Sequence, residues 1–122
     1  MPDVVAPPLD RKRFQDLLSD VRPVLTLDRH GTIQSGTRAA QQVLEHPPGA
    51  ALEPCFFSHV HERHRPRVMR DLADIVSRGK QRAHWLVRLR TGHDRWRWYR
   101  ATVRNDLGGD TGGILVHLQS VA

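Results

Sequence analysis

The feature that most constrains the fold is the stretch from residue 82 to 105, RAHWLVRLRTGHDRWRWYRATVRN. Its two arms are rich in β-branched, aromatic and long side chains, and the TGHD segment between them has the composition of a turn. We therefore expect a long β-hairpin in which each strand has two different faces, because successive side chains point to opposite sides. One face of the second arm suits a protein interior and carries Tyr99, Ala101 and Val103. The other face carries Trp96 and Trp98 among arginines, which suits a surface that an amphipathic element covers.

Shorter elements surround this hairpin, and they are predicted from turn residues and from the spacing of apolar side chains. Thr37 is a suitable N-cap for one helix, and Gly79 is a suitable residue to end another. Pro66 is compatible with the longer helix because it falls in the first turn. We expect strands at residues 24–28, 32–35 and 114–121, a helix at 38–45 and a longer helix at 63–78. This order indicates an α+β fold, an antiparallel sheet whose helices lie in one crossover on one face.

The N-terminal part of the chain differs from the rest. We divide the sequence into a flexible tail at 1–9, an N-terminal amphipathic helix at 10–21 and a single domain at 22–122. Three prolines and the lack of a periodic pattern mark the tail. In the helix, apolar residues recur at helical spacing; they are Phe14, Leu17, Leu18 and Val21.

Composition limits the compartment and the partners. The chain of 122 residues has a formal net charge of +6, and its arginines are scattered over several predicted elements, which indicates a solvated surface. We therefore expect no specific binding of nucleic acid. The alternative is a basic nucleic-acid-binding α+β module in which Trp96 and Trp98 stack on bases. No apolar run approaches the ~20 residues that span a bilayer, and neither a secretory signal nor a cysteine pair is evident, so we expect a cytoplasmic protein.

Several short motifs, in their order and spacing, resemble those of one known family. They are D-x-x-G-x-I at 28–33, an A-A-x-x-L-L-like helix at 39–44, His61 followed by Arg67-Val68, R-x-R-x-G at 88–92, Arg97-Trp98 and a terminal segment at 118–122. From about Pro23 to Ala122 the chain resembles the PAS sensor domains. The resemblance implies a five-stranded antiparallel sheet with helices on one face. It also implies a sensory, signalling and protein-interaction role without catalysis, either as a fragment joined to an output domain or as a partner-binding single domain.

The chain departs from the family pattern at several positions. Thr37 replaces the usual Asn, Glu62 replaces a Pro, and Thr91 replaces the Asp before Gly92. Ser120 replaces the aspartate of the terminal signature, which often couples such a domain to its output helix. The sequence therefore does not predict that a signal passes to an output helix through this residue.

Neither flavin nor haem is expected. The photoactive flavin-binding branch of the family uses a cysteine, but the resemblance places Phe56, and not Cys55, at that position. We expect Cys55 to be a small buried hydrophobic residue. Haem-binding members place the axial histidine at about Val68, so His64 is one turn too early.

An unknown small ligand is compatible with an apolar space between the sheet and the helices, and a filled core is the alternative. The candidate lining is Ile33, Val43, Leu44, Val68, Leu72, Leu89, Tyr99, Val103 and Val116.

The histidines at 59, 61 and 64 are the remaining candidates for chemistry. His59, His61 and His64 have spacings that suit a shared metal or a catalytic base, which gives a small α+β enzyme as a further alternative. We expect no metal, since no carboxylate or cysteine partner beyond Glu62 is apparent, and no enzymatic activity, since no nucleophile and base are paired.

Dimerisation is the last expectation. The helix at 10–21 is too short to be stable alone, so its apolar stripe needs a surface to cover. A symmetric homodimer satisfies this need, as the PAS resemblance also implies, and a monomer with the helix folded back is the alternative. The candidate interface is Phe14, Leu17, Leu18, Val21, Trp96 and Trp98.

Overall fold

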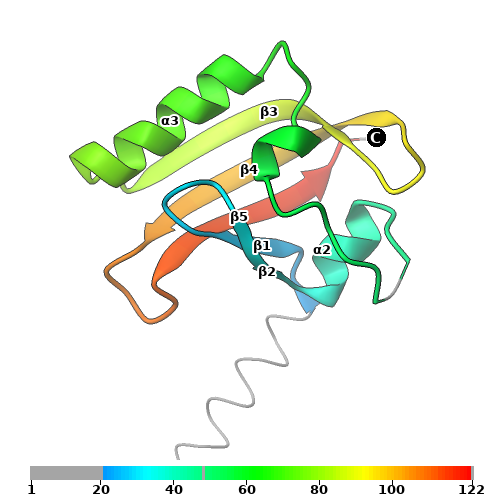
Figure 1. The fold of residues 1–122 in the computed structure, drawn as a ribbon, viewed down its shortest axis with the longest axis horizontal. Helices are drawn as coiled ribbons and strands as arrows, with labels where there is room; N and C mark the ends of the chain where they lie inside the picture. Colours follow the sequence, from blue (N-terminus) through cyan, green and yellow to red (C-terminus); the bar gives the residue numbers. More distant parts are fainter. Residues whose placement is uncertain (1–20, 48, 122) are drawn as a thin grey trace, which may run out of the picture.

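The computed structural model describes residues 21–47 and 49–121. Five strands and three helical elements follow one another along the chain (Figure 1). They are β1 (Val24–Leu27), β2 (Ile33–Gly36), α2 (Arg38–Val43), the 3-10 helix η1 (Phe56–His59), α3 (Arg65–Arg78), β3 (Arg82–Arg90), β4 (Trp96–Asp106) and β5 (Gly113–Ser120). The α+β fold predicted from the sequence is confirmed.

The five strands form one antiparallel sheet in the order β2-β1-β5-β4-β3. The long hairpin pairs β3 with β4 from Arg82↔Arg104 to Arg90↔Trp96, as its composition predicts. The C-terminal strand β5 lies between β1 and β4, so it joins the two hairpins into one sheet. Strand β5 is therefore in contact with both hairpins of the domain.

The expected tail at 1–9 and most of the expected helix at 10–21 lie outside the described residues. Val21 is the first residue described, and its side chain is 73% exposed.

Local sequence signals set the helix ends. The side chain of Thr37 accepts a 3.2 Å hydrogen bond from the Ala40 amide, which makes Thr37 the N-cap of α2, as predicted. The helix ends at Val43 and not at residue 45, because Glu45 adopts a left-handed backbone with φ 62°. Gly79 ends α3 in a left-handed conformation with φ 68°, which a residue without a Cβ adopts at low cost.

The start of α3 is later than predicted. The helix begins at Arg65 and not at residue 63, because residues 61–64 form a turn closed by a 2.8 Å hydrogen bond from the His64 amide to the His61 carbonyl. Pro66 lies in the first helical turn, where its missing amide hydrogen costs no helical bond.

The core lies between one face of the sheet and the helices. Helix α3 contacts β3 and η1, and α2 contacts β1 and β5 (Figure 1). The inward-facing residues of the long hairpin are buried, so the predicted assignment of its faces is confirmed. Trp85 stacks on Phe56 with ring centroids 6.2 Å apart, and its indole nitrogen donates a 2.9 Å hydrogen bond to Asp71. The ring of this buried indole is therefore packed against another aromatic ring, and its N–H group has a hydrogen-bond acceptor.

The other face of the sheet, here called the outer face, is not covered by any element among the residues described (Figure 1). It exposes large apolar side chains on β3 and β4, namely Leu86 at 49%, Trp96 at 41% and Trp98 at 38%. No helix in the described part of the chain is long and apolar enough to cross a membrane.

Candidate functional site

The outer face carries a group of aromatic and basic side chains at the end near the β3–β4 turn. We call it the Trp–His cluster, and its members are His61, His64, Arg88, Arg90, Trp96 and Trp98. Each indole contacts one imidazole and one guanidinium. The ring centroids of His61 and Trp96 are 4.9 Å apart, and Arg90 lies 5.8 Å from the Trp96 ring centre. Around the other indole, the ring centroids of His64 and Trp98 are 5.4 Å apart, and Arg88 lies 4.8 Å from the Trp98 ring centre.

The backbone beside edge strand β3 positions the two histidines. Val60 forms an antiparallel bridge with Leu89, and the His61 amide donates a 3.0 Å hydrogen bond to the Arg88 carbonyl. His64 is the N-cap residue of α3, and its side chain makes no capping bond. The imidazoles are consequently held against the indoles by the connection between η1 and α3.

Two polar atoms of the Trp–His cluster are buried without a hydrogen-bond partner, namely Nε of Arg88 and Nε2 of His64. Burial lowers the pKa of His64, and the nearby charge of Arg88 lowers it further. A cation at His64 would also lie at the N-terminus of α3, where the helix dipole disfavours positive charge. The neutral imidazole is therefore the form that fits this position at neutral pH.

Of the three histidines that the sequence groups together, His61 and His64 stay together, with ring centroids 6.0 Å apart, and His59 lies apart from them. His59 is 9% exposed, and its Nε2 lies 2.9 Å from the Glu53 carbonyl oxygen and not near the indoles. Its ring centroid lies 6.4 Å from that of His46, and both side chains line a cleft of about 450 Å³ beside the β3–β4 turn. Within residues 21–47 and 49–121, no group of three or more His, Cys, Asp or Glu is arranged to hold a metal ion. The geometry therefore gives no support to an enzyme or metal site built from His59, His61 and His64.

The nine candidate pocket residues do come together. Seven are fully buried in one hydrophobic core, and Ile33 and Val43 are partly buried and pack against it. The seven are Leu44, Val68, Leu72, Leu89, Tyr99, Val103 and Val116. The cleft beside the β3–β4 turn is lined by other, mainly polar residues.

The prediction that Cys55 is buried is wrong. Cys55 is exposed, because the residue after it, Phe56, turns into the core and is 1% exposed. The backbone of Cys55 pairs with Thr32 in an isolated bridge, which fixes this orientation. Its thiol therefore lies on the surface and away from the interior.

The candidate interface is only partly described. Phe14, Leu17 and Leu18 lie outside the described residues, whereas Val21 is exposed. Trp96 and Trp98 are on the outer face, as predicted, and they lie side by side with arginines in the register Arg88↔Trp98 and Arg90↔Trp96.

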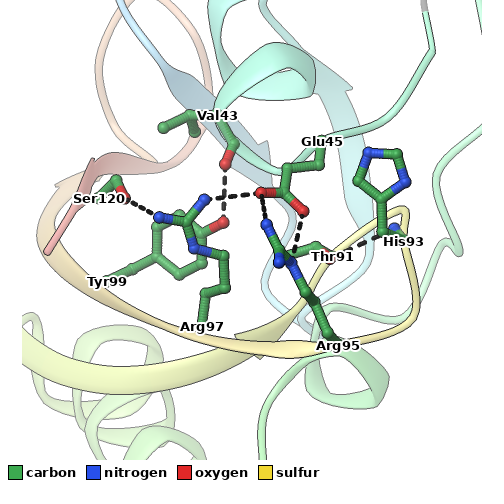
Figure 2. A network of polar contacts seen from close by, with 8 residues as sticks. All are labelled: Val43, Glu45, Thr91, His93, Arg95, Arg97, Tyr99 and Ser120. Carbon is green, nitrogen blue, oxygen red and sulfur yellow. Dashed lines mark hydrogen bonds and ion pairs between the residues drawn. The ribbon is translucent and has the colours of Figure 1, made fainter. Parts of the chain in front are cut away.

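A polar network on the helix side of the sheet was not predicted from the sequence, and Glu45 is its centre (Figure 2). Arg95 donates two hydrogen bonds to the Glu45 carboxylate, at 3.2 and 2.9 Å, and Arg97 donates another at 2.6 Å. A second amino group of Arg97 is 3.4 Å from the Ser120 hydroxyl. The network thus links the end of α2, the start of β4 and the end of β5.

The two arginines hold the pKa of Glu45 at about 2, well below its usual value, because they stabilise the ionised carboxylate. The sequence contained part of this signal, since Arg95 and Arg97 stand two residues apart, on the same side of a strand, and are therefore suited to share a partner. It did not indicate which carboxylate would be that partner.

Comparisons with known proteins agree on the fold. A family model described as the PAS fold matches residues 17–122. The structure is similar to a PAS domain of an HTR-like protein from Haloarcula marismortui, with a TM-score of 0.66 and 13% identity over 93% of this chain and 99% of that one. It is also similar to PAS-B of Drosophila melanogaster Cycle, with bound ethylene glycol, at a TM-score of 0.67 and 13% identity over 81% and 99% of the two chains.

A third similar structure is the PAS domain of a protein from Colwellia psychrerythraea, with a TM-score of 0.67 and 10% identity over 94% of this chain and 98% of that one. The search of curated proteins found no match. The family match covers most of the chain, including every strand and helix listed above. The chain therefore belongs to the PAS family and is a sensory and signalling domain.

Proposed function

We propose that this PAS domain acts in a signal-transduction protein as a protein-interaction module whose working surface is the outer face of its sheet, and that it forms a symmetric homodimer there. The observation that carries the proposal is the exposure of Trp96 and Trp98 beside Leu86 on a face without a covering element among the described residues. Large apolar side chains exposed together on one face of a small domain are typical of an interaction site. A partner protein or an output domain is the recipient of the signal.

In this proposal, residues 10–21 of each copy cover the outer face with Phe14, Leu17, Leu18 and Val21. The sequence pattern supports this assignment, since an amphipathic helix of this length gains its stability from packing. The domain works without catalysis and without flavin or haem, in the cytoplasm. A small ligand between the sheet and the helices remains part of the proposal, and the bound ethylene glycol in the Cycle PAS-B structure supports a search for one.

Sedimentation velocity of the full chain and of a variant that begins at Arg22 tests the dimer. We expect the full chain to be a dimer at high micromolar concentration and the shortened chain to be a monomer. A monomeric full chain removes the homodimer from the proposal. A dimer that persists without residues 1–21 shows that the N-terminal helix is not its cause.

Native mass spectrometry of the purified chain tests the ligand. A mass that exceeds the sequence mass by a constant small increment, and returns to it on denaturation, supports a bound small molecule. A mass that equals the sequence mass supports a filled core.

A further inference from the structure

We propose that the outer face around the Trp–His cluster binds a segment of another protein that carries carboxylates beside apolar side chains, such as an acidic amphipathic helix. This inference rests on the proposed function, because it also takes the outer face as the interaction surface. It adds the chemistry of the partner. An acidic segment and residues 10–21 compete for this face.

The first argument is charge. The outward-facing positions of β3 from Arg82 to Arg90 and of β4 from Trp96 to Arg104 contain no carboxylate. In the ion pairs between described residues, Arg90 pairs with Asp94 in the turn, and Arg95 and Arg97 pair with Glu45 on the other side of the sheet. No ion pair in that part of the chain involves the other outward arginines of the hairpin, which are Arg82, Arg88, Arg100 and Arg104. These positions therefore carry positive charge without carboxylates among them, and they are complementary to carboxylates of a partner.

The second argument is the mixture of apolar and basic groups. Leu86 stands opposite Arg100, and Trp98 stands opposite Arg88, so each arginine of these pairs has an apolar neighbour. A partner that matches both groups must alternate apolar and acidic side chains over the same surface. An amphipathic helix with acidic residues along the borders of its apolar stripe has this arrangement.

The third argument is the pair of unpartnered polar atoms. The side chains of Arg88 and His64 both contact the Trp98 indole. Nε of Arg88 and Nε2 of His64 are withdrawn from solvent and have no hydrogen bond. A carboxylate that binds the Arg88 guanidinium supplies a counter-charge at this point. The groups facing His64 are Arg88 on β3, His61 before it, and Arg63 and Arg67 around the start of α3, so an added negative charge also favours protonation of His64.

Two other occupants fit less well. An identical face from a second copy would place arginines against arginines, which opposes direct contact between two sheets. Single-stranded nucleic acid needs free aromatic faces for its bases. Each indole of the Trp–His cluster already contacts a guanidinium and an imidazole of its own chain, so a base would have to displace one of them.

The test uses the full chain and a synthetic helical peptide of leucine and glutamate, with the same peptide bearing lysine in place of glutamate as the control. Binding is measured by isothermal titration calorimetry. We expect the glutamate peptide to bind, the lysine peptide not to bind, and affinity to fall as salt rises. Arg88→Gln and Trp98→Ala should each weaken binding by about tenfold, whereas Arg70→Gln, which removes the same charge from an exposed site on α3, should leave it unchanged.

A pH series separates this site from general charge attraction. Binding by the parent chain should tighten as pH falls through the range in which His64 titrates, and His64→Gln should remove that part of the tightening. Equal affinity for the two peptides, no binding of the glutamate peptide, or tighter Trp98-dependent binding of an oligothymidine overturns the proposal. Sedimentation without peptide reports the homodimer separately, so a monomeric chain that binds the glutamate peptide contradicts only the dimer. A dimeric chain that does not bind the glutamate peptide contradicts only the proposal of an acidic partner.

Discussion

The hydroxyl of Tyr99 donates a 2.7 Å hydrogen bond to the carbonyl oxygen of Val43 and so joins β4 to the end of α2 (Figure 2). The Tyr99 side chain is fully buried, and burial raises its pKa because the charged phenolate is disfavoured there. One residue therefore contributes both to the apolar core and to the position of the α2 end. This connection lies next to the Glu45 network.

Two substitutions separate the roles of Tyr99. Tyr99→Phe keeps the ring and removes the hydrogen bond, so we expect a loss of about 1 kcal/mol in the free energy of unfolding. Tyr99→Ala also leaves a cavity and should cost about 3–5 kcal/mol, a large part of the stability of a domain of this size. Chemical denaturation followed by tryptophan fluorescence measures both. Equal stability of Tyr99→Ala and the parent would contradict the burial of this ring.

Glu45→Gln should lower the melting temperature, because it removes the carboxylate that holds Arg95 and Arg97. It should also shift the backbone amide resonance of Ser120, since Arg97 contacts both residues. Glu53→Gln changes an exposed glutamate and is the matched control. Thermal melts and two-dimensional NMR spectra of the three proteins provide the comparison. If the Ser120 resonance stays in place while the melting temperature falls, the network stabilises the domain but does not connect α2 to the end of β5.

Gly92 is predicted to tolerate no side chain. Its amide donates a 2.8 Å hydrogen bond to the Leu44 carbonyl, and an added Cβ would overlap the carbonyl of Glu45. Gly92→Ala should therefore destabilise the domain by more than ~1 kcal/mol, because backbone atoms cannot move aside as a side chain can. Gly108→Ala, at a site with open space around it, should stay within about 0.5 kcal/mol of the parent. Urea titrations of both variants decide the matter, and similar midpoints would show that the turn and the α2 end are not tightly docked.

The pH dependence of stability follows from histidines and one glutamate. Burial lowers the pKa values of His46, His64 and His117 below the ordinary histidine value of 6.5. The unfolded chain therefore binds protons more readily, so stability is full above about pH 6.5 and falls as pH drops through the lower folded values. The contribution of Glu45 is present above its ordinary pKa and is lost as pH falls towards its folded value of about 2. As pH is lowered from neutral, calorimetric melts should first show the loss of stability that is due to the histidines. A melting temperature that rises on mild acidification would contradict this prediction.

The purified protein should be colourless. The Cys55 thiol is on the surface, and the haem-type position on α3 is occupied by Val68, whose side chain is fully buried in the core. An absorption spectrum of the freshly purified chain checks this expectation. A flavin or haem band at a stoichiometric level would require a binding mode that neither the sequence nor the geometry suggests.

Much of the architecture was readable from the sequence, because it depends on neighbours along the chain. Alternation along residues 82–105 predicted the hairpin and its buried face, and Thr37 and Gly79 predicted two helix ends. These signals are local, since a cap or a strand face is set within a few residues. Short motifs in a fixed order were enough to suggest the family.

The sites depend on which side chains meet, and only the tertiary structure decided that. His59, His61 and His64 are close in sequence, yet the bridge between Val60 and Leu89 directs His61 and His64 to the indoles, while His59 faces His46. Glu45 reaches Arg95 and Arg97, about 50 positions away, only because the left-handed end of α2 packs on the β3–β4 turn. Periodicity gives the direction of a side chain relative to its own element, but the contact partner is set by the way separate elements pack, which no local pattern contains.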